Sequence, residues 1–140
     1  MLKQLGLLWL LTLFTYANHV HWLGDYDKAL EKAQQEHKPL LVLVVKKDAK
    51  LCNTILHKQF MNHCYIDTIN NKMVAVMVTY GGKTSYPIEM YYTTVFPSLF
   101  FVDTQTEMFM SEPLYGEQIS QKVLLQYFQP WMLKTKSQQH

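Results

Sequence analysis

The stretch that decides the fold is Lys38–Val45, which reads KPLLVLVV. Six consecutive apolar residues follow the proline, and three of them are β-branched valines. A short apolar run of this kind is typical of a strand buried on both faces of a parallel or mixed sheet. Pro39 ends the segment before it, because the residue preceding a proline is disfavoured in helical conformation. The stretch therefore predicts a central buried strand that directly follows a helix.

Three further segments have the character of strands. Met73–Val78 is a second apolar run, and Ser98–Val102 is a third that begins directly after Pro97. Glu107–Met110 follows a polar turn and is expected to pair antiparallel with the strand before it. Together with the central strand, these segments predict one sheet.

Helical periodicity appears on both sides of the predicted strands. Asp25 is a suitable N-cap for a helix whose apolar residues recur at i, i+3, i+4 and i+7 from Tyr26. A second helix is expected from about Leu51 to Phe60 or beyond, and a last one over Glu117–Phe128. The alternation of helices and strands in 140 residues predicts a single α/β domain over residues 18–130. In that domain a mixed sheet lies between helices on both faces, and residues 131–140 form a polar C-terminal tail.

Residues 1–17 have the organisation of a signal peptide. Lys3 precedes an apolar core of about ten residues, and Ala17 is a small residue at a suitable cleavage point. The core is short for a bilayer-spanning helix, which needs roughly 20 residues. We expect an exported protein, periplasmic or secreted, cleaved after Ala17, with no stable membrane span in its mature form. An uncleaved membrane anchor is the alternative.

The order of these segments resembles the thioredoxin superfamily. Residues 22–128 carry the resemblance, through a Trp and an Ala-containing helix ahead of Lys-Pro, a buried strand, a cysteine at a helix start, and Val-Phe-Pro-Ser before the third strand. The similarity is closest to periplasmic thioredoxin-like proteins such as the C-terminal domain of DsbD. It implies a thioredoxin-like fold, a cis-proline at Pro97, and thiol–disulfide chemistry at the helix start.

The sequence departs from the family at the redox motif itself. Counted without gaps from Lys38, the family's Cys-x-x-Cys falls on Ala49-Lys50-Leu51-Cys52, so only the resolving position is a cysteine. Asp48 stands where the family often has Trp, and Leu43 stands where many members bury an acid. A carboxylate beside a thiol disfavours the reactive thiolate. A dithiol cycle is therefore excluded at Ala49 and Cys52, although a shifted register would make Cys52 the attacking residue without a resolving partner.

The second of the two cysteines, Cys64, is the only other thiol available to Cys52. Twelve residues along a continuous helix span about 18 Å, whereas a disulfide needs Cα atoms within about 7 Å. A Cys52–Cys64 bridge therefore requires a break in the second helix. Without one, Cys64 is expected to be a half-buried small residue.

A tyrosine-rich connection, Tyr80–Val95, precedes the expected cis-proline. In thioredoxin-like folds the backbone before this proline pairs with an extended peptide, a case of strand addition. The resemblance therefore implies a polypeptide-binding surface formed by Ala49, Lys50, Leu51, Tyr91, Tyr92, Phe96 and Pro97. The alternative is that these aromatic side chains cover the sheet.

Composition and motif spacing exclude other classes of function. All 13 basic residues are lysines, the net charge is +2, and no basic stripe is present, so a nucleic-acid partner is not expected. Cys52, His57, His63 and Cys64 match no recurrent metal-site spacing, and no cofactor motif is present. We expect no metal site and no cofactor.

Three hypotheses about function remain at this point. The first is an exported binding or chaperone-like module for extended or thiol-bearing polypeptides, which lacks the attacking cysteine. The second is an active thiol–disulfide oxidoreductase that uses Cys52 alone or with Cys64. The third is metal or haem handling in respiratory-protein assembly.

Overall fold

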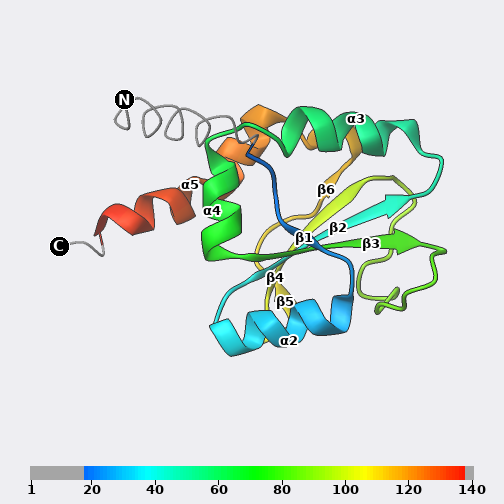
Figure 1. The fold of residues 1–140 in the computed structure, drawn as a ribbon, viewed down its shortest axis with the longest axis horizontal. Helices are drawn as coiled ribbons and strands as arrows, with labels where there is room; N and C mark the ends of the chain where they lie inside the picture. The colour runs from blue at the N-terminus through cyan, green and yellow to red at the C-terminus, as the bar shows by residue number, and fades with distance from the viewer. Residues whose placement is uncertain (1–17, 138–140) are drawn as a thin grey trace, which may run out of the picture.

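A computed structural model gives the structure of residues 18–137 (Figure 1). Its elements in chain order are β1 (Trp22–Leu23), α2 (Tyr26–Glu36), β2 (Leu40–Lys46), α3 (Lys50–Gln59), α4 (Tyr65–Lys72), β3 (Val74–Tyr80), β4 (Ser98–Asp103), β5 (Met108–Phe109), β6 (Leu114–Tyr115), the 3₁₀ turn η1 (Gly116–Gln118) and α5 (Gln121–Ser137). The predicted signal peptide, residues 1–17, and residues 138–140 lie outside the described residues.

The strands form one mixed sheet in the order β1-β3-β2-β4-β5, with β6 also paired to β4. β2 runs parallel to β3 and antiparallel to β4, so it is the central strand, as the KPLLVLVV stretch predicts. Strand β5 pairs antiparallel with β4 over two residues. The predicted α/β class with a mixed sheet is confirmed.

Helices cover both faces of the sheet (Figure 1). Helix α2 lies on one side, and α3, α4 and α5 lie on the other. Asp25 caps α2 as expected, since its carboxylate accepts a hydrogen bond from the Lys28 N–H at 3.1 Å. Within residues 18–137, every helix falls short of the length and apolarity needed to cross a bilayer.

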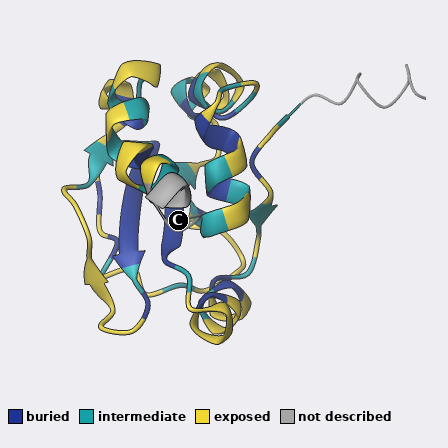
Figure 2. Ribbon diagram, turned by 90° about the vertical axis from the view of Figure 1, so that its left-hand side faces the viewer, coloured by how far each residue is buried: buried dark blue, intermediate teal, exposed yellow. Residues whose placement is uncertain are grey.

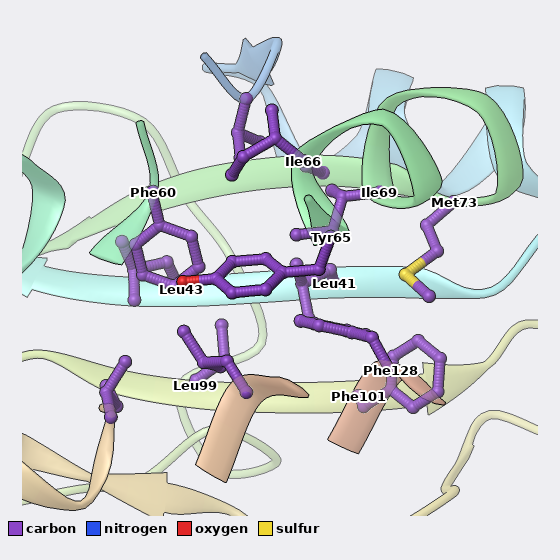
Figure 3. Close-up of a cluster of buried hydrophobic side chains, with 14 of the residues drawn as sticks. Leu41, Leu43, Phe60, Tyr65, Ile66, Ile69, Met73, Leu99, Phe101 and Phe128 are labelled. Carbon is purple, nitrogen blue, oxygen red and sulfur yellow. The ribbon is translucent and has the colours of Figure 1, made fainter. Parts of the chain in front are cut away.

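The buried side chains of the sheet divide between two cores because neighbouring strand residues point to opposite faces. Leu41 and Leu43 of β2 join the core under α3, α4 and α5, whereas Leu40, Val42 and Val44 join the core under α2. Figure 3 shows the first core, where Tyr65, Phe60 and Phe128 pack onto β2 and β4. Figure 2 shows buried strands at the centre of the fold, and these are β2, β3 and β4.

The second helix lies within one residue of its predicted bounds, Leu51 and Phe60, but it does not continue beyond them. Helix α3 ends at Gln59, and a separate helix, α4, begins at Tyr65. Between them Met61 forms a β-bridge with His19, and Asn62 adopts a left-handed conformation at φ 59°. Helical periodicity continues through this segment in the sequence, so the break comes from tertiary pairing with the chain before β1.

The C-terminal helix also differs from the prediction. It begins at Gln121, after a 3₁₀ turn, and continues through Pro130 to Ser137. The expected polar tail therefore begins as helix. Trp131 explains the extension, because its ring packs edge-on against Phe101 at 5.7 Å and so joins the core.

Candidate functional site

The start of α3 carries Ala49, the residue that counting from Lys38 predicts at the position of the family's attacking cysteine. Ala49 is the N-cap residue, half-exposed, and its N–H donates to the Lys46 carbonyl at 3.2 Å. Asp48 before it has a left-handed backbone at φ 71°. Alanine offers no side-chain acceptor or thiol at this point, so the helix begins without a side-chain cap.

Cys52 lies one turn further on, as the third residue of α3. Its N–H donates to the Ala49 carbonyl at 3.1 Å, and the residue is 4% exposed. A thiol must reach the substrate's sulfur to exchange with it. Burial therefore hinders Cys52 as an attacking group.

Cys64 lies on a different element, at the N-cap of α4. It is exposed, and both cysteines are free. The chain does break between α3 and α4, as a bridge would require, yet Cys52 and Cys64 are not joined. The expectation that Cys64 is half-buried is wrong, because the break in the helix places it at the surface.

The segment before Pro97 forms the second part of the site. The Phe96–Pro97 peptide bond is cis, and the Pro97 carbonyl accepts from the Gly116 N–H at 2.8 Å. Val95 is satisfied internally, because its N–H donates to Thr93 Oγ1 and its carbonyl accepts from the Thr93 and Ser98 hydroxyls. By contrast, within residues 18–137 no hydrogen bond is made by the Phe96 N–H or carbonyl.

Gly116 brings the two parts of the site together. Its φ is +57°, and a Cβ added there would lie 3.1 Å from Val95 Cγ1 and 3.8 Å from Leu51 Cδ2. The first turn of α3, the segment before Pro97 and the start of η1 therefore meet at one place. Gly116 was not predicted as a site residue, because in the sequence it only precedes the expected last helix, Glu117–Phe128.

Phe96 is surrounded by side chains from the ends of the two central strands. Its ring lies 5.3 Å from the ring of Tyr80, which ends β3, and the Lys46 ammonium, at the end of β2, stands 5.7 Å from the Phe96 ring centre. A cation over an aromatic face is an attractive arrangement. Neither Lys46 nor Tyr80 was a predicted site residue, although Lys46 directly follows one predicted strand and Tyr80 comes two residues after another.

The predicted tyrosines separate into two environments. Tyr92 is 66% exposed and is available at the rim, whereas Tyr91 is 1% exposed and belongs to the core under α2. The Tyr91 and Tyr26 hydroxyls share a hydrogen bond at 2.8 Å. Burial is the main cause that raises the pKa of both tyrosines. The Tyr91 side chain packs between the sheet and α2, so of the two predicted tyrosines Tyr92 is the one with an exposed side chain.

The cysteines and histidines are the candidate metal ligands that the sequence offers. Among residues 18–137, no three His, Cys, Asp or Glu side chains are grouped so that they could hold a metal ion. His63, beside Cys64, is instead bonded through Nε2 to the Lys58 carbonyl at 2.6 Å. The Cys/His group of the sequence is thus dispersed in the fold.

Comparison with known proteins places this geometry in a family. Residues 9–99, more than half of the chain, match the family model Thioredox_DsbH, described as a protein of unknown function, DUF255. No curated protein matches the chain.

Solved structures agree on the fold. One described as "DsbH Oxidoreductase" has a TM-score of 0.63 at 18% identity, over 81% of this chain and 84% of its own. A thioredoxin from Thermus thermophilus has a TM-score of 0.66 at 15% identity, over 83% of this chain and 89% of its own. The chain therefore belongs to the DUF255, DsbH-related family of the thioredoxin superfamily.

Proposed function

We propose that the chain is an exported polypeptide-binding module of the thiol–disulfide family that performs no dithiol cycle. The observation that carries the proposal is Ala49 at the start of α3, with the nearest cysteine of the motif buried one turn behind it. Reduction of a disulfide needs an exposed thiolate at this helix start and a second thiol to release the mixed disulfide. The chain lacks the first of these groups.

The binding part of the proposal rests on the backbone of Phe96. Its N–H and carbonyl have no partner in the described part of the chain, so they suit an extended peptide added antiparallel to this segment. Exposed apolar area lies on one side at Tyr92 and Val95. The proposed surface also takes in the cis Pro97 and the first turn of α3, with Ala49, Lys50 and Leu51, because Leu51 and Val95 both approach Gly116, whose N–H donates to the Pro97 carbonyl.

Export is supported by the character of residues 1–17, with a cleavage point at Ala17. Asn18, the first residue that the structure describes, is bonded to the rest of the domain. The Asn18 N–H donates to Asn62 Oδ1, and the Asn18 side-chain amide donates to Asp67, both at 3.1 Å. Cleavage after Ala17 would leave these anchoring groups in place.

The test combines binding and turnover on the mature chain, residues 18–140. Fluorescence anisotropy with a labelled, carboxymethylated insulin B chain measures binding of an unfolded polypeptide without thiol chemistry. We expect binding that Phe96→Ala weakens and that Cys52→Ser leaves unchanged. Phe109→Ala is the matched control, since it removes the same side chain from an exposed position on β5.

Insulin reduction with dithiothreitol is the second measurement. The proposal expects no turnover that depends on Cys52, and clear turnover lost in Cys52→Ser would overturn it. The exposed Cys64 thiol favours one alternative, a mixed disulfide with a thiol-bearing partner. A thiol count on the exported protein, before and after reductant, with Cys64→Ser as comparison, distinguishes a free thiol from a capped one.

A further inference from the structure

A cavity of about 310 Å³ lies between α3 and the β1 edge of the sheet. Its lining residues are His19, Val20, Trp22, Asn53, Leu56, His57, Phe60, Met61 and Met77. None of these residues belongs to the site around Phe96 and Cys52. The cavity therefore needs an explanation of its own.

Four of the lining side chains carry nitrogen or sulfur atoms that can bind a metal ion. His19 and Met61 are partners in an antiparallel β-bridge, which places their side chains side by side. His57 comes from the last turns of α3, four residues before Met61, and Met77 comes from the neighbouring strand β3. Two imidazoles and two thioethers thus line one cavity.

The types of side chain that line the cavity indicate which metal ion it suits. The lining contains no Asp, Glu or Cys, so hard cations such as Mg²⁺ and Ca²⁺ lack the oxygen ligands they require. Zn²⁺ is normally held by four Cys, His or carboxylate ligands, and here it would find only two. Thioethers favour Cu(I), and imidazole suits copper as well.

We propose that this cavity binds a single soft monovalent metal ion, Cu(I), through Met61, Met77, His57 and His19. Between the donors lie the apolar side chains of Val20, Trp22, Leu56 and Phe60, and the amide of Asn53 completes the lining. Apolar walls lower the local dielectric and so favour an ion of low charge. The ion enters and leaves as Cu(I), and no electron transfer is involved.

The test uses Ag⁺, which has the charge and softness of Cu(I) but does not change oxidation state. Both cysteines are first removed, as Cys52→Ala and Cys64→Ser, because thiolates would bind the probe themselves. Titration calorimetry and tryptophan emission are then followed on residues 18–140. We expect one equivalent of Ag⁺ to bind, to change the Trp22 emission and to raise Tm.

Met61→Leu with Met77→Leu should weaken Ag⁺ binding by about tenfold or more. Mutating a residue that only supports a metal ligand already lowers metal affinity about 10–100-fold, and here two proposed ligands are removed. Leucine has nearly the volume of methionine, so the fold is kept. The matched control is Met108→Leu with Met110→Leu, two exposed methionines elsewhere on the surface, and it should bind as tightly as the parent. His57→Asn should also weaken binding.

Three outcomes would overturn the proposal. They are no Ag⁺ bound by the cysteine-free chain, undiminished binding after the Met61 and Met77 changes, or an equal loss in the Met108 and Met110 control. Competition by equimolar Zn²⁺ would also contradict it. The same titration with Cu(I) under anaerobic conditions should give the same order of variants.

Discussion

The backbone N–H of Cys52 donates a hydrogen bond to the carbonyl of Ala49, 3.1 Å away, so the first turn of α3 joins the two residues that the sequence predicts at the outer positions of Cys-x-x-Cys. One of the two carries a methyl group in place of a thiol, and the other is 4% exposed. If the predicted alignment is right, one of the two sulfur atoms of a redox pair is missing and the other is buried. Redox chemistry at this helix start can therefore be tested by adding a thiol at position 49 as well as by removing the thiol of Cys52.

Ala49→Cys should give the chain disulfide-reducing activity. The half-exposed N-cap position at a helix start favours a thiolate, and Cys52 lies one turn away to resolve the mixed disulfide. Insulin turbidity with dithiothreitol should rise clearly above the parent. Ala49→Ser is the size-matched control, and Ala49→Cys with Cys52→Ser should lose multiple turnover. Activity equal in all variants would contradict this prediction.

Asp48→Asn should then increase the activity of the Ala49→Cys variant near neutral pH. The Asp48 carboxylate directly precedes the new thiol, and a negative charge there raises a thiol's pKa, so its removal makes the thiolate more abundant. Asparagine tolerates the left-handed φ of 71° at this position. The rate of reaction with iodoacetamide, measured against pH, should shift to lower pH. An unchanged pH profile would show that the carboxylate does not act on the thiol.

Gly116→Ala should destabilise the fold more than Gly81→Ala. Both glycines have a left-handed φ, which costs a residue with a Cβ about 1–2 kcal/mol. At Gly81 a Cβ has no atom within 4 Å, whereas at Gly116 it lies 3.1 Å from Val95 Cγ1. Urea unfolding of the two variants measures the difference, and anisotropy with the insulin B chain should show weaker binding only for Gly116→Ala. Equal losses of stability would mean that the Val95 side chain moves away from the added Cβ at no measurable cost in stability.

The sequence predicts the sheet because apolar runs of strand length are unambiguous when a proline bounds them. Pro39 and Pro97 mark the starts of the two antiparallel neighbours β2 and β4, and the Asp25 cap marks α2. The two-residue strands β1 and β6 leave no such signal, since each depends on pairing with a strand far away in the chain. The break before α4 is hidden for the same reason.

The site is predicted only in part, because burial cannot be read from residue type within the aromatic connection. Tyr91 and Tyr92 are neighbours of identical chemistry, yet one is 1% and the other 66% exposed. Tyr91 is held inside by Tyr26, which lies 65 residues earlier in the chain. The Cys52 position, by contrast, follows from simple counting along the strand and turn.

Trp131→Ala should lower the free energy of unfolding by roughly 2 kcal/mol, somewhat below the 3–5 kcal/mol typical of fully buried aromatic residues. Its ring contacts Phe101 and extends the core beyond Pro130. Leu133→Ala, two residues further along the same helix, is the control, because a side chain 55% exposed should change stability by no more than about 0.5 kcal/mol. Equal effects in urea unfolding would indicate that the helix after Pro130 contributes nothing.

The buried Tyr26–Tyr91 pair should make the fold sensitive to alkali. Burial raises the pKa of both tyrosines above the ordinary value of 10.0. The neutral forms are therefore favoured in the folded state, so their contribution to stability is complete below about pH 10. It is lost as the pH rises above 10, because the unfolded chain then ionises while the folded chain does not. Each such tyrosine costs about 1.4 kcal/mol per pH unit in this range.

Tyr91→Phe tests this sign. At pH 8 it should lower the free energy of unfolding by about 1–2 kcal/mol, since the Tyr26 hydroxyl loses its partner. Between pH 10 and 11 the variant should lose less stability than the parent, by about 1 kcal/mol, because one ionising tyrosine is gone. Tyr92→Phe, at an exposed position, should follow the parent at every pH. Parallel curves for Tyr91→Phe and the parent would mean that Tyr91 ionises as readily in the folded chain as in the unfolded one.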